Sequence, residues 1–256
     1  MGLFYLLTLY CFIRAVESPR PRPWYDLCVV ACALGMASKE VMASAPLLVM
    51  LYDRAFVSGL FREAWRRRCT LYLALAGTWI LLGCLVFFTE RFSFALANAR
   101  VLGITWWAYL LTEPGVILHY LRLAVWPHPL CFDYYGWPFA RTWMSILPPA
   151  LVVAILLGAT AWAWKANSAW GILGAWFFLI LAPSSSFIPT DSPAYEHRMY
   201  LPLAAVVVPA VMGIYTRLGR RSLVVFLVVA VGLGFLTARR NEDYLAVNCP
   251  SGLTRL

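Results

Sequence analysis

Acidic, imidazole and guanidinium side chains stand together in the segment Pro183–Pro202, which reads PSSSFIPTDSPAYEHRMYLP. It contains Asp191, Glu196, His197 and Arg198 between two strongly apolar runs. An arginine beside a histidine suits an anion, because the guanidinium offers two parallel donors to a phosphate. The segment therefore predicts an anion site in which Glu196 orients a cationic neighbour. The competing interpretation is a solvated loop whose adjacent charges satisfy one another.

Lys39 and Glu40 form a second polar pair between apolar runs. If Trp24–Tyr52 were one helix, both charges would lie at mid-membrane, where each costs about 2.5 to 3.5 kcal/mol. Two short helices forming a hairpin would instead place the pair at the turn, and we expect this arrangement. Lys39 would then supply a second positive charge to the anion at Arg198. A simple interfacial ion pair is the alternative.

The composition indicates an integral membrane protein. The chain is 62% hydrophobic and 13% charged, with a mean hydropathy of +0.73, whereas soluble domains average about 45 to 50% apolar and about 25% charged residues. The net charge of +9 does not indicate nucleic acid, because the basic residues cluster in short junctions such as Arg62–Arg68, where they set topology. The seven cysteines show no CxxC spacing, so we interpret them as small buried side chains.

We therefore predict an all-α, polytopic helical bundle with about eight membrane helices. One further segment, Thr105–Trp126, carries Glu113 and Pro114 near its centre, which favours a re-entrant or interfacial helix over a span. Arg14–Pro23 is predicted to be a loop. The later spans are expected at Cys69–Phe88, Met144–Trp164, Trp170–Ala182, Leu201–Tyr215 and Ser222–Leu236.

The sequence features at the two ends predict that the chain is a piece of a larger protein. The first apolar run has no basic residue ahead of it and has Arg14 directly behind it, the reverse of a signal peptide. We expect residues 1–238 to form the membrane domain, with its beginning lost, and residues 239–256 to form a polar tail.

The aromatic loop Pro127–Trp143 contributes Asp133 and Tyr134, which could lie on the acceptor side of a site. An aspartate before aromatic residues is also a common turn or cap residue. His119 and His128 are interpreted as structural, because no second ligand residue accompanies either at metal-binding spacing. No metal site is predicted, although a divalent metal requirement is left open.

Three ordered motifs resemble a known family. They are ASKEVMASAPLLVMLYDRAF (Ala37–Phe56), YLRLAVWPHPLCFDYYGWP (Tyr120–Pro138) and DSPAYEHRMYLPL (Asp191–Leu203), separated by hydrophobic spans. Together they resemble the membrane domain of the transmembrane and tetratricopeptide-repeat proteins, which are GT-C-type glycosyltransferases. The similarity covers most of the chain.

The resemblance implies an inverting transferase that passes a mannose-like sugar from a polyprenyl-phosphate donor to a protein hydroxyl. Its site would face the periplasm or the lumen, in the bacterial inner membrane or the endoplasmic reticulum. The expected partners are membrane lipid, the lipid-linked donor and a protein acceptor, with no nucleic acid. The acidic catalytic residue is expected upstream of this chain, and a missing repeat domain is expected to start in the tail.

The resemblance also implies roles for particular residues. The donor phosphate would be bound by Lys39, His197 and Arg198. The orienting residues would be Glu40, Glu196 and Tyr200. Two alternatives remain for the whole chain: a transporter or flippase for a lipid-linked anion, in which the same charges line a pathway, and an inert membrane anchor.

Overall fold

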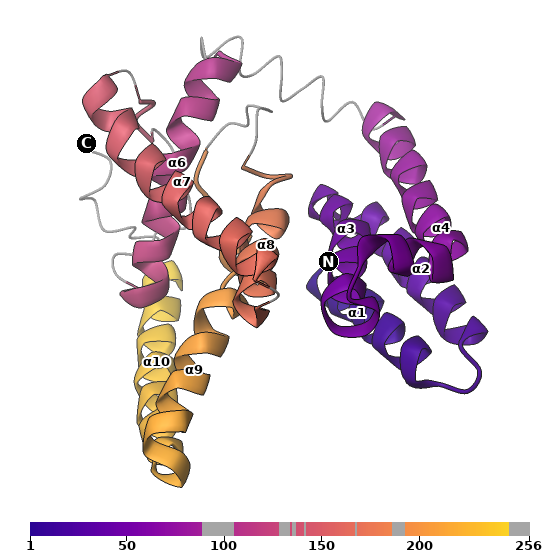
Figure 1. The fold of residues 1–256 in the computed structure, drawn as a ribbon. Coiled ribbons are helices and arrows are strands. Elements are labelled where there is room, and N and C mark those ends of the chain that lie inside the picture. The colour runs from indigo at the N-terminus through magenta and orange to yellow at the C-terminus, as the bar shows by residue number, and fades with distance from the viewer. Residues whose placement is uncertain are drawn as a thin grey trace.

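The computed structural model describes residues 1–88, 105–127, 134, 137–140, 142–166, 168–185 and 193–245, with side chains to residue 239. Regular structure in this part is entirely helical, as predicted (Figure 1). The α-helices are α1 (Gly2–Glu17), α2 (Arg22–Ser38), α3 (Ala45–Tyr52), α4 (Phe61–Phe88), α6 (Trp106–Val125), α7 (Trp143–Lys165), α8 (Ala169–Leu181), α9 (Ala204–Leu218) and α10 (Ser222–Leu245).

Four described stretches are long and apolar enough to cross a membrane. They are Glu40–Ser58, Phe61–Phe88, Trp143–Lys165 and Ala204–Arg239. The remaining helices are shorter or more polar, so about half of the expected spans meet this criterion. These four stretches agree with the predicted class, a helical membrane protein. They do not establish the predicted number of about eight membrane helices.

The chain reverses direction at Lys39. The hydroxyl groups of Tyr5 and Ser44 lie 3.1 Å apart, and the rings of Phe12 and Tyr52 meet edge to face, so α1 and α3 run in the same direction. The short connection after α1 turns the chain back, which makes α2 antiparallel to both. This confirms the predicted hairpin. We call the end of this bundle that holds Tyr5 and Ser44 the Lys39 end.

The opposite end, which we call the Arg68 end, carries the basic junction. The guanidinium of Arg68 lies 5.8 Å from the ring centre of Phe12. Helix α4 begins here and runs to the Lys39 end, where Trp79 Nε1 donates to the carbonyl of Ala43 at 3.0 Å. The predicted span Cys69–Phe88 follows directly after a kink at Arg68, which has φ −134° and ψ 31°. A further helical segment from Phe61 precedes the kink.

The predicted loop Arg14–Pro23 is also shorter than expected. Helix α1 continues to Glu17, whose carboxylate lies 3.7 Å from Arg14 Nη1 one turn earlier. Helix α2 begins at Arg22 with Pro23 in its first turn, where a proline's missing N–H costs nothing. The helical propensity of charged side chains thus extends both helices into the polar junction.

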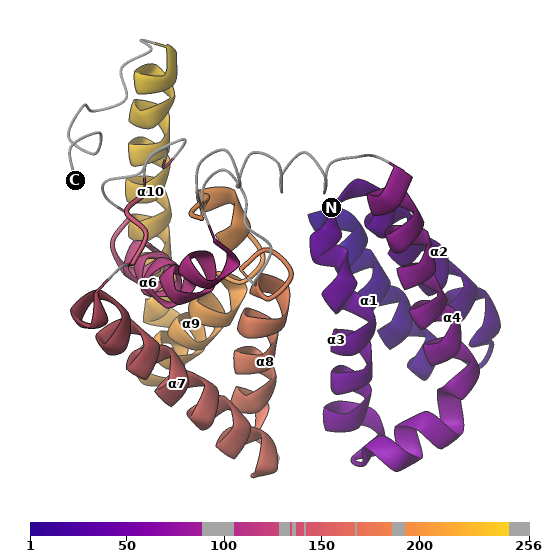
Figure 2. The same cartoon turned by 90° about the horizontal axis from the view of Figure 1, so that it is seen from above.

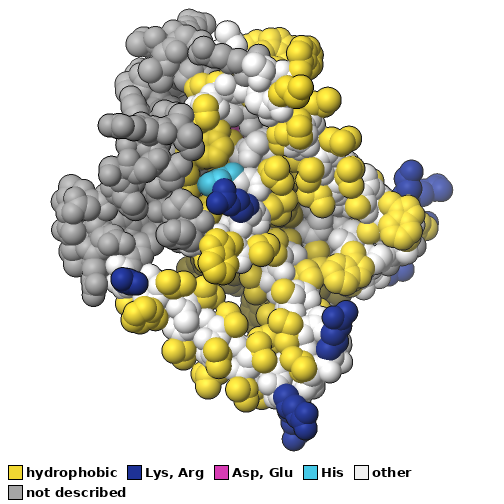
Figure 3. All heavy atoms as spheres, turned by 90° about the vertical axis from the view of Figure 1, so that its left-hand side faces the viewer, with side chains coloured by type: hydrophobic (Ala, Val, Ile, Leu, Met, Phe, Trp, Pro, Cys, Tyr) yellow, Lys and Arg dark blue, Asp and Glu magenta, His cyan; other side chains and the backbone are white. Residues whose placement is uncertain are grey.

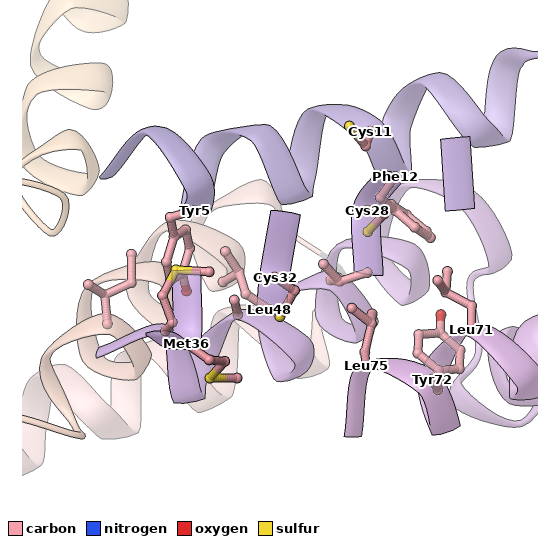
Figure 4. Packing of buried hydrophobic residues seen from close by; sticks show 14 of the residues in the cluster. Tyr5, Cys11, Phe12, Cys28, Cys32, Met36, Leu48, Leu71, Tyr72 and Leu75 are labelled. Atoms are coloured by element: carbon pink, nitrogen blue, oxygen red, sulfur yellow. The ribbon is translucent and has the colours of Figure 1, made fainter. Parts of the chain in front are cut away.

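Helices α1 to α4 share one hydrophobic core (Figure 4). Its largest fully buried members are aromatic or sulfur-containing, among them Tyr5, Phe12 and Met36. Cys28 and Cys32 face α1 and α4 as buried thiols, which confirms their interpretation as small buried side chains.

Helices α7 and α8 form a hairpin that packs against this core. Trp164, at the end of α7, lies 4.5 Å from the guanidinium of Arg54 and stacks on Phe61 at the Arg68 end. Trp176 on α8 meets Tyr5 edge to face, with ring centres 5.7 Å apart. Helix α8 therefore returns to the Lys39 end, and the segment that follows it begins there.

Helix α6 lies across the other helices. Figure 2 shows it close to end-on, whereas α1, α3 and α8 run along the page. It is not among the four stretches that could cross a membrane. A re-entrant or interfacial helix would have this orientation, and its place in a membrane stays a prediction.

Helices α9 and α10 are joined by a turn at Gly219, which has φ +55°, and diverge from it (Figure 2). No residue of α9 is buried. Figure 3 shows hydrophobic side chains spread over the described face on this side of the molecule. Helix α10 continues to Leu245, past the predicted end of the membrane domain at residue 238, and the tail beyond it lies outside the described residues.

Candidate functional site

Lys39 lies at the turn between α2 and the 3₁₀ helix Glu40–Ser44. Its backbone is extended, with φ −166° and ψ 142°, which ends α2 and lets the chain reverse. The Lys39 side chain is half-buried and the Glu40 side chain is exposed. The predicted pair is thus at a helix junction with its charges close to the surface.

The short 3₁₀ helix Glu196–Met199 carries the other predicted cationic residues. The hydroxyl of Tyr120 on α6 anchors its start, because it accepts from Tyr195 N at 2.7 Å and donates to Tyr195 O at 3.0 Å. Trp176 on α8 anchors its end by donating from Nε1 to the carbonyl of Leu201 at 2.8 Å. Two aromatic side chains from different helices therefore fix this segment.

The Arg198 side chain hydrogen-bonds to two backbone carbonyls that precede it in the chain. Its Nη1 donates to the carbonyls of Ser184, at 3.0 Å, and Pro193, at 2.9 Å, and its guanidinium lies 4.9 Å from the ring centre of Tyr195. The side chain remains partly exposed. One nitrogen of the guanidinium thus holds the loop closed, a structural role that accompanies any role in binding.

The three predicted cationic residues lie close enough to affect one another. Burial lowers the pKa of Lys39, and Arg198 lowers it further, whereas Glu40 acts in the opposite direction. Burial also lowers the pKa of His197, as do Lys39 and Arg198. Burial would lower the pKa of Arg198, but neighbouring tyrosines and Glu113 outweigh it and raise that pKa. The structure thus brings Lys39, from the first half of the chain, to His197 and Arg198.

Glu113 on α6 is a site residue that the sequence analysis missed. Its side chain is only 3% exposed, and it interacts electrostatically with Arg198. Burial raises the pKa of Glu113 to about 7, while Arg198, Tyr109 and Ser185 act to lower it. A carboxylate in the middle of an apolar segment was the available signal, and we used it only to judge whether the helix spans.

Glu196 faces a different set of side chains from the predicted one. Its Oε1 accepts from the Tyr134 hydroxyl at 3.1 Å, and Nε2 of His119 lies 3.1 Å from the same hydroxyl. The rings of His119, Tyr134 and Trp137 also contact one another edge to face. Because the tyrosine proton goes to Glu196, His119 donates from Nε2. Glu196 thus ties the aromatic loop to the 3₁₀ helix Glu196–Met199, while Tyr134 also contacts His119 of α6. The orienting role of Glu196 toward Arg198 stays a prediction.

The other predicted residues are distributed as follows. Tyr200 is 70% exposed and lies against α1, so close to Gly2 that a β-carbon there would be 2.7 Å from Tyr200 Cε1. Tyr134 is buried in the aromatic loop. Asp133 and Asp191 lie outside the described residues.

Within the described ranges, no group of three or more histidine, cysteine, aspartate or glutamate side chains could hold a metal ion. Comparison with protein-family models, with curated proteins and with solved structures found no match.

Proposed function

We propose that this chain is part of a GT-C-type membrane glycosyltransferase that binds a polyprenyl-phosphate sugar donor at the Lys39 end. In this proposal Lys39, His197 and Arg198 bind the donor phosphate, and a mannose-like sugar passes to a protein hydroxyl at the non-cytoplasmic face. The bundle comprises the predicted membrane helices together with α6 as the re-entrant or interfacial helix.

The observation that carries the proposal is the convergence of Lys39, His197 and Arg198 from segments far apart in sequence. Lys39 and Arg198 are like charges, which destabilise a fold when they lie close together unless an anion neutralises them. A phosphate satisfies such a group well, because a guanidinium and an ammonium both donate to its oxygens. Preorganised positive charge is also what stabilises a departing phosphate in a transfer reaction.

The hydrophobic surroundings support a lipid-linked phosphate over a soluble one. Helices long enough to cross a membrane converge on the Lys39 end, so a ligand bound there would have its charged group at a bilayer boundary. A polyprenyl chain could then remain in the lipid while its phosphate meets the cationic side chains.

Binding of polyprenyl phosphate to the purified protein in lipid nanodiscs tests the proposal, with the matching polyprenyl alcohol as the control ligand. We expect the phosphate to bind and the alcohol not to bind. Arg198→Lys and Lys39→Gln should each weaken binding about ten- to a hundredfold, because a hydrogen bond to a charged group contributes about 1.5 to 3 kcal/mol. Arg217→Gln, in the exposed end of α9, should leave binding unchanged.

Transfer is tested with the same lipid carrying a labelled sugar and with a hydroxyl-bearing acceptor protein, in membranes containing the full-length protein. Equal affinity for the phosphate and the alcohol would refute the phosphate site. Binding followed by movement of the lipid between leaflets, without transfer, would replace this proposal with the flippase alternative.

A further inference from the structure

Glu113 is the most unusual buried group in the described part of the chain. Its two carboxylate oxygens and the nearby buried hydroxyl of Ser185 make no hydrogen bond of good geometry, although the hydroxyls of Tyr109 and Ser185 lie near enough to lower the pKa of Glu113. Among the described residues, these three atoms are the buried side-chain oxygens and nitrogens without a well-formed hydrogen bond. An ionised carboxylate in such a place is costly, since these donors do not fully offset the desolvation of the charge.

One of the described groups around Glu113 carries a charge that can balance its ionised carboxylate. Arg198 faces it from the 3₁₀ helix, Tyr109 and Tyr120 face it from α6 itself, and Ser185 faces it from the end of α8. Where α7 and α8 pack on α6, their buried side chains are apolar: Val153, Phe177 and Leu181. Among the described residues that face Glu113, Arg198 therefore carries the only fixed charge.

Two other ionisable groups that interact with Arg198 are less buried than Glu113. Lys39 and His197 interact with Arg198 rather than with Glu113. Burial lowers the pKa of His197, so the imidazole is neutral where Glu113 titrates. Burial raises the pKa of Tyr120 to about 12, so its hydroxyl keeps its proton throughout this range. Glu113 is thus the group near Arg198 that changes charge around neutral pH.

We propose that Glu113 is a proton-binding site linked to anion binding at Arg198, so that the protein takes up a proton when the donor phosphate binds. The inference rests on the proposed function, because it takes the phosphate to be the anion. While Glu113 is ionised, it cancels the positive charge of Arg198. When phosphate approaches, the two anions compete for one guanidinium, and protonation of the buried carboxylate removes the competitor.

The balance of charge and protons is simple. A phosphodiester donor brings one negative charge that does not titrate between pH 6 and 9. The proton comes from solvent, binds one carboxylate oxygen of Glu113, and leaves again when the phosphate departs. With a pKa of about 7 for Glu113 in the free protein, donor affinity should fall about tenfold per pH unit above neutrality.

Calorimetric titration of the full chain with farnesyl-phosphoryl mannose at pH 8, in buffers of different ionisation enthalpy, measures the protons exchanged. We expect uptake of about one proton by the wild type and none by Glu113→Gln. The variant should bind about tenfold more tightly than the wild type at pH 8, and its affinity should not vary between pH 7 and 9. His119→Gln, which removes the half-buried imidazole of α6, should keep the proton uptake.

Infrared difference spectra of the wild type provide a measurement that needs no variant. Donor binding at pH 8 should produce the C=O band of a protonated carboxyl group. Binding without proton uptake, or uptake that persists in Glu113→Gln, would overturn the linkage and leave the phosphate site standing. If neither protein binds the donor at all, the phosphate site and the linkage both fail.

Discussion

Nη1 of Arg68 lies 2.9 Å from each carboxylate oxygen of Asp53, and Asp53 is completely buried. The same carboxylate accepts from the hydroxyls of Ser58 and Tyr72. These contacts close the turn between α3 and α4, where the chain adopts a π-helix and α4 bends. The ion pair thus fixes the Arg68 end of the bundle.

Breaking this pair should be strongly destabilising. Asp53→Ala leaves the Arg68 guanidinium without its counter-charge, and we expect a loss of about 3 to 5 kcal/mol in unfolding free energy. The surface pair Glu63–Arg67 is a matched control at 2.7 Å, with side chains 38% and 59% exposed. Glu63→Gln should cost about 0.5 kcal/mol. Denaturant unfolding in detergent, followed by tryptophan fluorescence, compares them, and equal losses would contradict the assigned role.

The α7–α8 hairpin depends on the absence of a side chain at Gly171. A β-carbon there would lie 2.7 Å from the backbone nitrogen of Trp164, and backbone cannot move aside as a flexible side chain can. Gly171→Ala should therefore cost about 1 to 3 kcal/mol. Gly158→Ala in α7, with open space around it, should instead stabilise the helix by up to about 1 kcal/mol. Thermal unfolding of both variants checks the opposite signs.

The segment that carries His197 and Arg198 should loosen when its anchor on α6 is removed. Tyr120→Phe deletes both hydrogen bonds to the Tyr195 backbone, and we expect a loss of about 1 to 3 kcal/mol. Hydrogen exchange at the Tyr195 amide should speed up at the same time. Tyr215→Phe, at an exposed tyrosine on α9, provides the control. Unchanged exchange in Tyr120→Phe would show that other contacts hold the segment.

Glu113 should make the fold less stable as the pH rises. Its pKa is raised on folding from 4.5 to about 7, so its contribution is fully present below pH 4.5 and is lost as the pH rises through 7. The loss should approach about 3 kcal/mol at pH 8. Glu113→Gln should remove this dependence, so the difference in melting temperature between variant and wild type should widen from pH 5 to pH 8. A constant difference would contradict the burial of an ionisable carboxylate.

The sequence was sufficient to predict the helical class and the reversal at Lys39, because both follow from where charges interrupt apolar runs. It was also sufficient to nominate Lys39, His197 and Arg198, which the fold brings together. The pattern could not show that one nitrogen of Arg198 is occupied by the carbonyls of Ser184 and Pro193. Such contacts depend on loop geometry, which hydropathy does not encode.

The contacts of Glu196 and Glu113 could not be predicted from the sequence either. Glu196 stands beside His197 and Arg198 in sequence, yet it accepts from Tyr134, which lies across the fold. Glu113 is far from Arg198 in sequence, yet it faces that residue. Adjacent residues on a tight 3₁₀ turn point in different directions, so neighbours in sequence need not share a site. Only the placement of α6 decides which carboxylate approaches the guanidinium.

The transverse position of α6 has a mechanical consequence for the Lys39 end. His197 and Arg198 are attached through Tyr195 to α6, whereas Lys39 belongs to the turn after α2. The spacing of these cations is therefore set by how two groups of helices pack, and Trp176 links them by contacting Tyr5 and donating to Leu201. A ligand bound by both groups of helices would add a second link between them.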